Sequence, residues 1–352
     1  MTYRRRAFAV AVSVALVGSS MLSAQKKDEQ KKDDAQKKEI QSIVSIVDGV
    51  VAGQPAQNDL GLTWVQADFL KAQGNKEYVP FTVSVDVSKV TGNTVALYWR
   101  VVAKAAADAP APAPSGKKDD KDKKKAPQYA YEDVTFVPTA GATSPVHISR
   151  SFTVSAGAYD VFVVAKEPAN EKAPKNAPAP KVSAMKQAVT VPDFWNNELS
   201  TSSVIITSRI DPLAAPLTPQ QQADRPYAMG AMELVPAFDL HLSKKAELST
   251  FMLIYNPKVD GTNKPDVTVE YNFYQKPKDG AEKFFNKTNP QALNAQTLPP
   301  TFDLAAGHQL QSGQAVPLAS FPEGDYRLEI KVTDKLGNKT VTRDVNFSVA
   351  AS

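Results

Sequence analysis

The side chains best suited to chemistry are few and widely spaced in this chain. The three histidines are His147, His241 and His308, and none lies within four positions of another. A zinc site needs three or four converging nitrogen, sulfur or oxygen ligands, and the sequence contains no cysteine. We therefore expect isolated histidines on strands or loops, and the sequence nominates no catalytic, cofactor-binding or metal-binding residue.

Short motifs of catalysis and nucleotide binding are also missing. The sequence has no His-Glu-x-x-His, Gly-x-Ser-x-Gly, phosphate-loop or dinucleotide-binding glycine pattern. Residues 86–88 resemble the opening of the metal-dependent adhesion motif Asp-x-Ser-x-Ser, but Val90 stands where the motif has its second hydroxyl. We interpret Asp86 as part of the polar face of a strand. Residues 260–263 are interpreted as a plain turn, with a nearby cation as the alternative.

Three aromatic residues on one predicted strand indicate a different kind of site. Tyr271, Phe273 and Tyr274 would contribute to a sugar-binding platform if Tyr274 faced outward, opposite to Phe273. A core aromatic cluster is the interpretation that we favour.

The charge of the chain narrows the choice of partner. The formal charge of +4 falls to +1 when the three arginines of a predicted export signal are removed. A nearly neutral chain gives no case for a nucleic acid or an anionic membrane surface. Residues 117–125 concentrate six Lys and three Asp. We interpret them as a solvated loop, and binding to an anionic surface polymer is the alternative.

Residues 1–24 have the organisation of an export signal. Residues 4–6 are arginines, residues 7–18 are almost wholly apolar, and small residues precede a cleavage site near Ala24. The apolar stretch is short for a permanent membrane span, although a retained anchor is the alternative. The lack of cysteine suits a bacterial protein. We therefore expect a periplasmic or secreted protein with no permanent membrane span after cleavage.

Two segments, residues 25–39 and 40–58, connect the predicted export signal to the first predicted domain. Residues 25–39 repeat Gln-Lys-Lys followed by an acidic residue. They predict a charged disordered tether, because no apolar surface offsets the entropy of ordering them. Residues 40–58 begin with apolar residues at helical spacing and predict a short helix and a connection. We expect this helix to dock on the first domain, and docking on a membrane or a partner is the alternative.

The remaining chain alternates apolar and polar residues between turns rich in Gly, Pro and Asn, which predicts antiparallel β-sandwiches. We expect a first sandwich at 59–194, with mobile insertions at 104–128 and 167–181. A linker and leading strand follow at 195–230, and a second sandwich at 231–350.

The two predicted sandwiches are similar in sequence, at a shift of roughly 170 positions. Trp99 corresponds to Tyr271, and residues 157–159, Gly-Ala-Tyr, correspond to residues 324–326, Gly-Asp-Tyr. Immunoglobulin domains bury a central Trp and carry a tyrosine corner, whose hydroxyl bonds to nearby backbone. The sequence therefore predicts an all-β protein of two tandem immunoglobulin-like sandwiches, with a fibronectin-type sandwich as the alternative.

Several segments of the second half also resemble a known group of proteins. Residues 191–194, Val-Pro-Asp-Phe, residues 199–210 and residues 321–328 are similar to segments of exported acidobacterial-type proteins. These are the von Willebrand factor A-related and GWxTD-containing families, whose β-rich regions have no assigned chemistry. The chain has no Gly-Trp-x-Thr-Asp sequence. The resemblance implies a sandwich fold and an envelope or secreted setting, and it transfers no functional residue.

Together these patterns favour a non-enzymatic exported protein that mediates protein or surface interactions in the bacterial cell envelope. The expected partner is an envelope or secreted protein, or a glycan, and no cofactor or nucleic acid is expected. One alternative is a carbohydrate-binding module that uses exposed Tyr and Trp. Others are an accessory subunit of a periplasmic or secreted assembly, and a periplasmic enzyme in which His241 or His308 meets two carboxylates.

Overall fold

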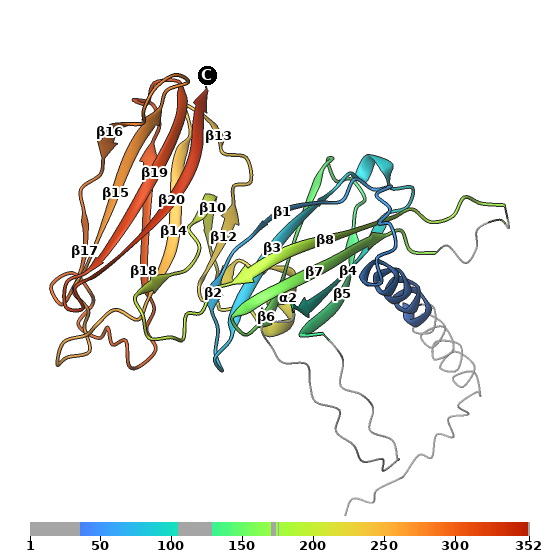
Figure 1. The fold of residues 1–352 in the computed structure, drawn as a ribbon, viewed down its shortest axis with the longest axis horizontal. Helices are drawn as coiled ribbons and strands as arrows, with labels where there is room; N and C mark the ends of the chain where they lie inside the picture. Colours follow the sequence, from blue (N-terminus) through green and yellow to red (C-terminus); the bar gives the residue numbers. More distant parts are fainter. Residues whose placement is uncertain (1–35, 105–128, 170–173, 175, 351–352) are drawn as a thin grey trace, which may run out of the picture.

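The computed structural model contains two β-sandwiches side by side, with a helix on the outside of the first (Figure 1). It describes residues 36–104, 129–169, 174 and 176–350. The predicted export signal, most of the predicted tether and residues 105–128 of the first predicted insertion lie outside the described residues. Within the described part of the chain, no helix is both long and apolar enough to cross a membrane.

Two antiparallel sheets form the first sandwich. One sheet has β3 in its middle, paired with β6 on one side and with β1 and β2 on the other. Its strands are β1 (Thr63–Ala67), β2 (Leu70–Lys71), β3 (Glu77–Val85) and β6 (Val146–Val154). The facing sheet has the order β5-β4-β7-β8. Its strands are β5 (Tyr131–Pro138), β4 (Thr94–Ala103), β7 (Gly157–Lys166) and β8 (Val182–Val191).

Alternation along the strands builds the core between these sheets. Val79, Phe81, Val83 and Val85 on β3 point inward and are fully buried, as the period of two requires. Trp99 on β4 packs edge-on against Phe81, with ring centroids 5.8 Å apart. The predicted central tryptophan is therefore a core residue.

The second sandwich repeats this plan with added strands. Its first sheet has the order β11-β12-β10-β14-β18, and β9 also pairs with β14. These strands are β9 (Ser200–Thr201), β10 (Ile205–Pro212), β11 (Ala228–Met229), β12 (Met232–Pro236), β14 (Glu247–Tyr255) and β18 (Leu310–Pro317). The facing sheet has the order β13-β20-β19-β15-β16, and β17 also pairs with β15. These strands are β13 (His241–Ser243), β15 (Val267–Lys276), β16 (Lys283–Lys287), β17 (Gln291–Leu293), β19 (Gly324–Asp334) and β20 (Lys339–Ala350).

The corresponding residues occupy the same places in both sandwiches. Trp99 lies opposite Val163 on β7, and Tyr271 lies opposite Ile330 on β19. Each of these positions is six residues after the glycine that begins its strand. Trp99 Nε1 donates to a backbone oxygen of β6 at 3.2 Å, and the Tyr271 hydroxyl bonds to a serine of β18 at 2.9 Å. Both side chains thus bridge the two sheets of their own sandwich.

Both tyrosine corners are present. The Tyr159 hydroxyl donates to the carbonyl of Ser155 at 2.8 Å, and the Tyr326 hydroxyl donates to the carbonyl of Pro322 at 2.7 Å. These bonds and the strand orders confirm the all-β fold of two tandem immunoglobulin-like sandwiches. The strand that follows β4 pairs with β4 and not with β6, so the sheets differ from the four-plus-three division of a constant-type immunoglobulin domain.

A helix over residues 36–51 packs on the outer face of the β5-β4-β7-β8 sheet. Its Ile43 and Val47 are fully buried against the sheet. The helix already includes residues 36–39, which corrects the predicted extent of the disordered tether. These residues are ordered because Glu39 is buried and forms an ion pair with Lys166 of β7.

A second correction concerns Asp86, which does not lie on the polar face of a strand. β3 ends at Val85, and Asp86 is the N-cap of a single 3-10 turn, η1 (Val87–Lys89). Its carboxylate accepts hydrogen bonds from the backbone N–H of Ser88 at 3.2 Å and from the hydroxyl of Ser144 at 2.6 Å. A short polar side chain at this position satisfies a free N–H at the start of the turn.

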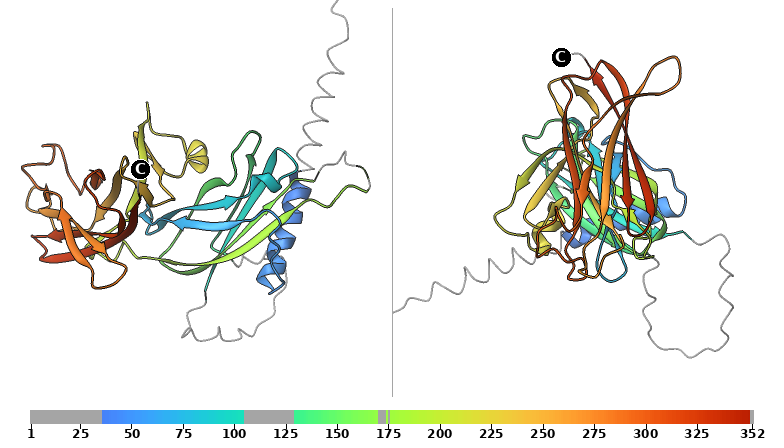
Figure 2. Two further views of the ribbon diagram at one scale, coloured as in Figure 1. Left: turned by 90° about the horizontal axis from the view of Figure 1, so that it is seen from above. Right: turned by 90° about the vertical axis from the view of Figure 1, so that its left-hand side faces the viewer.

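The second sandwich packs against the first near β2, the start of β3 and β6, at the other end of the first sandwich from the helix over residues 36–51 (Figure 2). Leu70 and Tyr78 of the first sandwich pack into one apolar cluster with Phe251, Leu253 and other residues of the second. The short helix α2 (Pro219–Asp224) and β6 are also in contact. The predicted leading strand, β10, lies inside the sheet, between β12 and β14.

Hydrogen bonds tie the same interface together. The N–H of Phe69 donates to the Ser203 hydroxyl at 2.9 Å, and the N–H of Ser203 donates back to the carbonyl of Phe69 at 3.0 Å. The Tyr227 hydroxyl donates to the buried carboxylate of Asp68 at 2.7 Å. Apolar burial combined with these hydrogen bonds makes the two sandwiches one packed unit.

Candidate interaction surface

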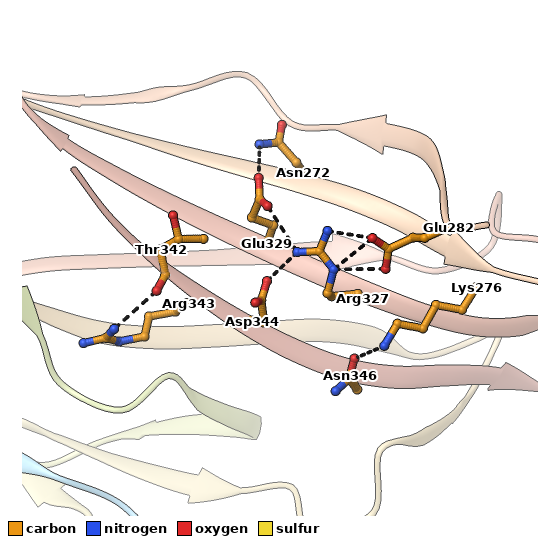
Figure 3. Close-up of polar contacts among 9 residues, drawn as sticks. All are labelled: Asn272, Lys276, Glu282, Arg327, Glu329, Thr342, Arg343, Asp344 and Asn346. Carbon is orange, nitrogen blue, oxygen red and sulfur yellow. Dashed lines mark hydrogen bonds and ion pairs between the residues drawn. The ribbon is translucent and has the colours of Figure 1, made fainter.

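The outer face of the β16-β15-β19-β20 sheet carries a connected set of polar side chains (Figure 3). Because alternate residues point outward, this face carries Asn272, Tyr274 and Lys276 from β15 and Arg327 and Glu329 from β19. Strand register places Tyr274 directly opposite Arg327, and Asn272 directly opposite Glu329. We call this face the C-terminal polar face.

Arg327 is the centre of the C-terminal polar face. Its Nη2 donates to Glu282 Oε2 at 2.7 Å, and its Nε lies 3.0 and 3.1 Å from the two oxygens of the same carboxylate. Its Nη1 donates to Glu329 at 3.1 Å and to Asp344 at 2.5 Å. Three carboxylates from β19, β20 and the loop before β16 therefore hold one guanidinium in a fixed orientation.

An aromatic pair adjoins this ionic cluster. The guanidinium carbon of Arg327 lies 4.5 Å from the centroid of the Tyr274 ring, which is within cation–π distance. Phe284 on β16 contacts the same ring edge-on, with centroids 5.8 Å apart, and 57% of Phe284 is exposed. Aromatic residues and arginine are both enriched in protein interfaces relative to the rest of the surface.

The charges of the cluster stabilise one another. The hydrogen bond to Arg327 holds the pKa of Glu282 below its ordinary value. The hydrogen bonds from Arg327 to Glu282, Asp344 and Glu329 outweigh its partial burial and raise its own pKa. Arg327 and Glu282 therefore both keep their charges through the neutral pH range.

The equivalent face of the first sandwich has the opposite character. Phe162, Val164 and Tyr98 there correspond to Glu329, Lys331 and Glu270 in the second sandwich, and the helix over residues 36–51 covers them. Duplicated sheets thus present an apolar, covered face in one copy and a polar, open face in the other. The covered face has an ion cluster of its own, in which Arg100 of β4 pairs with Asp48 of the helix at 2.6 Å and with Glu132 of β5 at 3.4 Å.

The structure keeps the three histidines apart. His147 packs on Phe238 at a centroid distance of 4.6 Å, and the ring of the exposed His241 bonds to the neighbouring Asp239 at 2.9 Å. His308 Nδ1 accepts a hydrogen bond from the N–H of Asp303. Within the part of the chain that the structure describes, no group of three or more His, Asp or Glu side chains is arranged to hold a metal ion.

The structure also tests the predicted aromatic platform and the predicted turn at residues 260–263. Tyr271 and Phe273 are fully buried, so the aromatic platform that would include them is wrong, and only Tyr274 faces outward. Asp260 accepts hydrogen bonds from the N–H groups of Thr262 and Lys264, as the turn interpretation expects. Residues 117–125 lie outside the described residues.

The sequence analysis did not predict that Glu282, Glu329 and Asp344 surround Arg327. Alternation along β19 identifies Arg327, Glu329 and Lys331 as outward-facing, but Glu282 and Asp344 are distant in sequence. Only the register of three strands places them around one guanidinium.

Comparisons with known proteins add little to this description. No family model matches the chain, and no curated protein matches it. Among solved structures, Salmonella alpha-2-macroglobulin reacted with methylamine is 14% identical, with a TM-score of 0.21, over 84% of this chain and 17% of that chain. The native conformation of E. coli alpha-2-macroglobulin is 12% identical, with a TM-score of 0.20, over 84% of this chain and 16% of that chain. Similarity of this size carries no argument about function.

Proposed function

We propose that the chain is a non-enzymatic binding protein that contacts another protein through the C-terminal polar face. The supporting observation is the fixed Arg327 beside the exposed Phe284, on a sheet whose counterpart in the first sandwich is covered. Arginine and aromatic side chains contribute most of the energy at protein interfaces, and the surrounding acids and lysines supply a polar rim.

The proposed setting is the bacterial cell envelope or the exterior of the cell. The support is the arginine-led, apolar segment at residues 1–24 together with the lack of cysteine. The packed two-sandwich unit would then present the C-terminal polar face to an envelope or secreted partner.

Site-specific photo-cross-linking tests the proposed function. A photoreactive residue is placed at Phe284 in the full chain, in cells that naturally make the protein, and at exposed Leu336 on the β19–β20 turn as the matched control. We expect one dominant adduct from position 284, and none of the same mass from position 336. Adding Arg327→Ala should abolish that adduct. Equal adducts at both positions, or an adduct that is indifferent to Arg327→Ala, would contradict the proposal.

A further inference from the structure

The two sandwiches differ at the outer edge of their last strand. In the second sandwich, β13 runs parallel to the end of β20 and covers that edge. His241 lies opposite Ser348, Leu242 lies opposite Val349, and the N–H of Ser348 donates to the carbonyl of Leu240 at 2.9 Å. The corresponding strand of the first sandwich is β8, since Val191 lies opposite Gly157 as Val349 lies opposite Gly324.

Only the beginning of β8 is covered on its outer edge by residues that the structure describes. The N–H of Asp59 donates to the carbonyl of Val182 at 3.0 Å, and the N–H of Ala184 donates to the carbonyl of Gln57 at 2.8 Å. Backbone groups of an antiparallel strand point alternately to its two neighbours. The next outward groups are therefore those of Lys186, Ala188 and Thr190.

These three residues form an open edge. Their side chains are exposed, and no described backbone carbonyl accepts a hydrogen bond from their N–H groups. Thr190 corresponds to Ser348, whose N–H donates to the carbonyl of Leu240, the residue before β13. Among the outward carbonyls, that of Ala188 accepts a hydrogen bond from the exposed side-chain amide of Gln187 at 3.1 Å, which an added strand would displace. The open N–H edge is thus a position at which the second sandwich already holds a strand.

We propose that the edge of β8 from Lys186 to Thr190 is a strand-addition site for an extended segment of another protein. The added segment runs parallel to β8, as β13 runs parallel to β20, and gains main-chain hydrogen bonds along the edge. This site is separate from the C-terminal polar face and does not depend on the function proposed for it.

The second sandwich also indicates the composition of the added segment. On β13, Leu242 packs against the core while the preceding His241 is exposed. A segment on β8 would likewise place an apolar side chain beside Val189 or Val191, which are buried, and polar side chains on the other face. An alternating polar and apolar sequence without proline is the chemistry that fits.

β8 lacks the usual protection of an edge strand. It contains no proline and no bulge, and its pairing with β7 is regular over all ten residues. Lys186 is the one charged residue on the strand, and its ammonium is bound to Asp160 of β7 at 2.8 Å. Its charge is therefore held on the outer face of the sheet and does little to prevent another strand from pairing with the edge.

A labelled peptide tests the proposal on the full mature chain. The probe is the segment of residues 237–245, Ala-Phe-Asp-Leu-His-Leu-Ser-Lys-Lys, which includes β13. We expect saturable binding by fluorescence anisotropy, and slower hydrogen exchange at the amides of Lys186, Ala188 and Thr190. The same peptide with Leu242→Pro should not bind, because proline removes a ladder donor.

Two variants of the protein separate edge binding from other effects. Ala188→Pro removes an outward N–H and should weaken peptide binding about tenfold or more. Ala188→Ser keeps the N–H and should bind as the unaltered chain does. Thr190→Pro gives a second test if Ala188→Pro disturbs folding, which near-ultraviolet circular dichroism reports.

Three results would overturn the strand-addition site. The first is absence of saturable binding, and the second is binding that both proline variants retain. The third is protection at Ser348 without protection at Ala188, which would place the peptide on the second sandwich. A dimer of the chain that forms through β8 in sedimentation experiments would also contradict a foreign segment as the occupant.

Discussion

Glu167 and Asp334 occupy corresponding positions in the two sandwiches, ten residues after the glycines that begin β7 and β19. The Glu167 carboxylate accepts a hydrogen bond from the N–H of Thr91 in the loop before β4. The Asp334 carboxylate accepts one from the N–H of Lys258, in the loop before β15, at 2.8 Å. The same loop is therefore attached to the same strand end in both copies.

A second bond completes the relationship. Glu167 also accepts from the N–H of Lys181 at 2.9 Å, and Asp334 accepts from the N–H of Gly337 at 3.0 Å. Lys181 and Gly337 both lie in the connection that leads to the last strand of their sandwich. One buried carboxylate thus joins two loops in each sandwich, although the side chains differ by a methylene group.

Asp334→Ala should destabilise the second sandwich by about 3 kcal/mol, since two N–H groups lose their acceptor at a fully buried site. Hydrogen exchange of the β19 amides measures the change in the second sandwich separately. Asp325→Ala is the matched control on the same strand, because Asp325 is exposed. A loss below about 1 kcal/mol for Asp334→Ala would show that water replaces the carboxylate.

The tyrosine corners should contribute separately to the two sandwiches. Tyr159→Phe and Tyr326→Phe each remove one hydrogen bond to a backbone carbonyl, so each should cost about 1 kcal/mol. The two substitutions lie in different cores, and their effects should add in the double variant. Urea unfolding of the single and double variants measures both quantities. Strong non-additivity would mean that the corners are coupled across the interface.

The sequence was sufficient to predict the fold because the corresponding residues keep structural roles. Trp99 and Tyr271, and likewise Tyr159 and Tyr326, lie at positions where this fold buries a large side chain or bonds a hydroxyl to the backbone. Such requirements are local to a strand, so type and spacing reveal them.

The surfaces could not be predicted in the same way. Tyr98, Phe162 and Val164 form an apolar stripe on the outer side of their sheet, and only the docked helix explains it. Similarly, Arg327 finds Glu282 and Asp344 through strand register, which depends on packing of the whole sandwich. Period-two patterning separates the two faces of a strand but does not say what covers either face.

Asp68 should make the interface between the sandwiches sensitive to pH. Burial raises its pKa from 3.8 to about 6, and hydrogen bonds from Tyr227 and Gln66 offset this only partly. Between about pH 4 and pH 6, Asp68 is therefore protonated in the folded state but ionised in the unfolded state. Stability should fall as pH rises through this range, by about 3 kcal/mol at most.

Asp68→Asn tests the pH dependence of the interface. The amide carries no charge, so the variant should lose most of the dependence between pH 4 and pH 7 and should be more stable than the unaltered chain at pH 7. Urea unfolding at several pH values, followed by intrinsic tryptophan fluorescence, measures this. Asp193→Asn, at an exposed acid near the same junction, controls for a general charge effect. A variant with unchanged pH dependence would assign the titration to another group.

The ion pair between Glu39 and Lys166 should decide how firmly the N-terminal helix is held. Both side chains are more than 90% buried, and removal of one partner leaves the other as an uncompensated buried charge. Glu39→Gln should therefore loosen residues 36–51 by about 3 kcal/mol or more, measured as faster hydrogen exchange. Lys38→Gln, at the exposed neighbour, should leave exchange unchanged.

The double variant Glu39→Leu with Lys166→Leu should recover most of the protection, because an apolar pair avoids the cost of burying charge. If the double variant exchanges as fast as Glu39→Gln, the ion pair itself holds the helix, and the apolar contacts of Ile43 and Val47 are not sufficient.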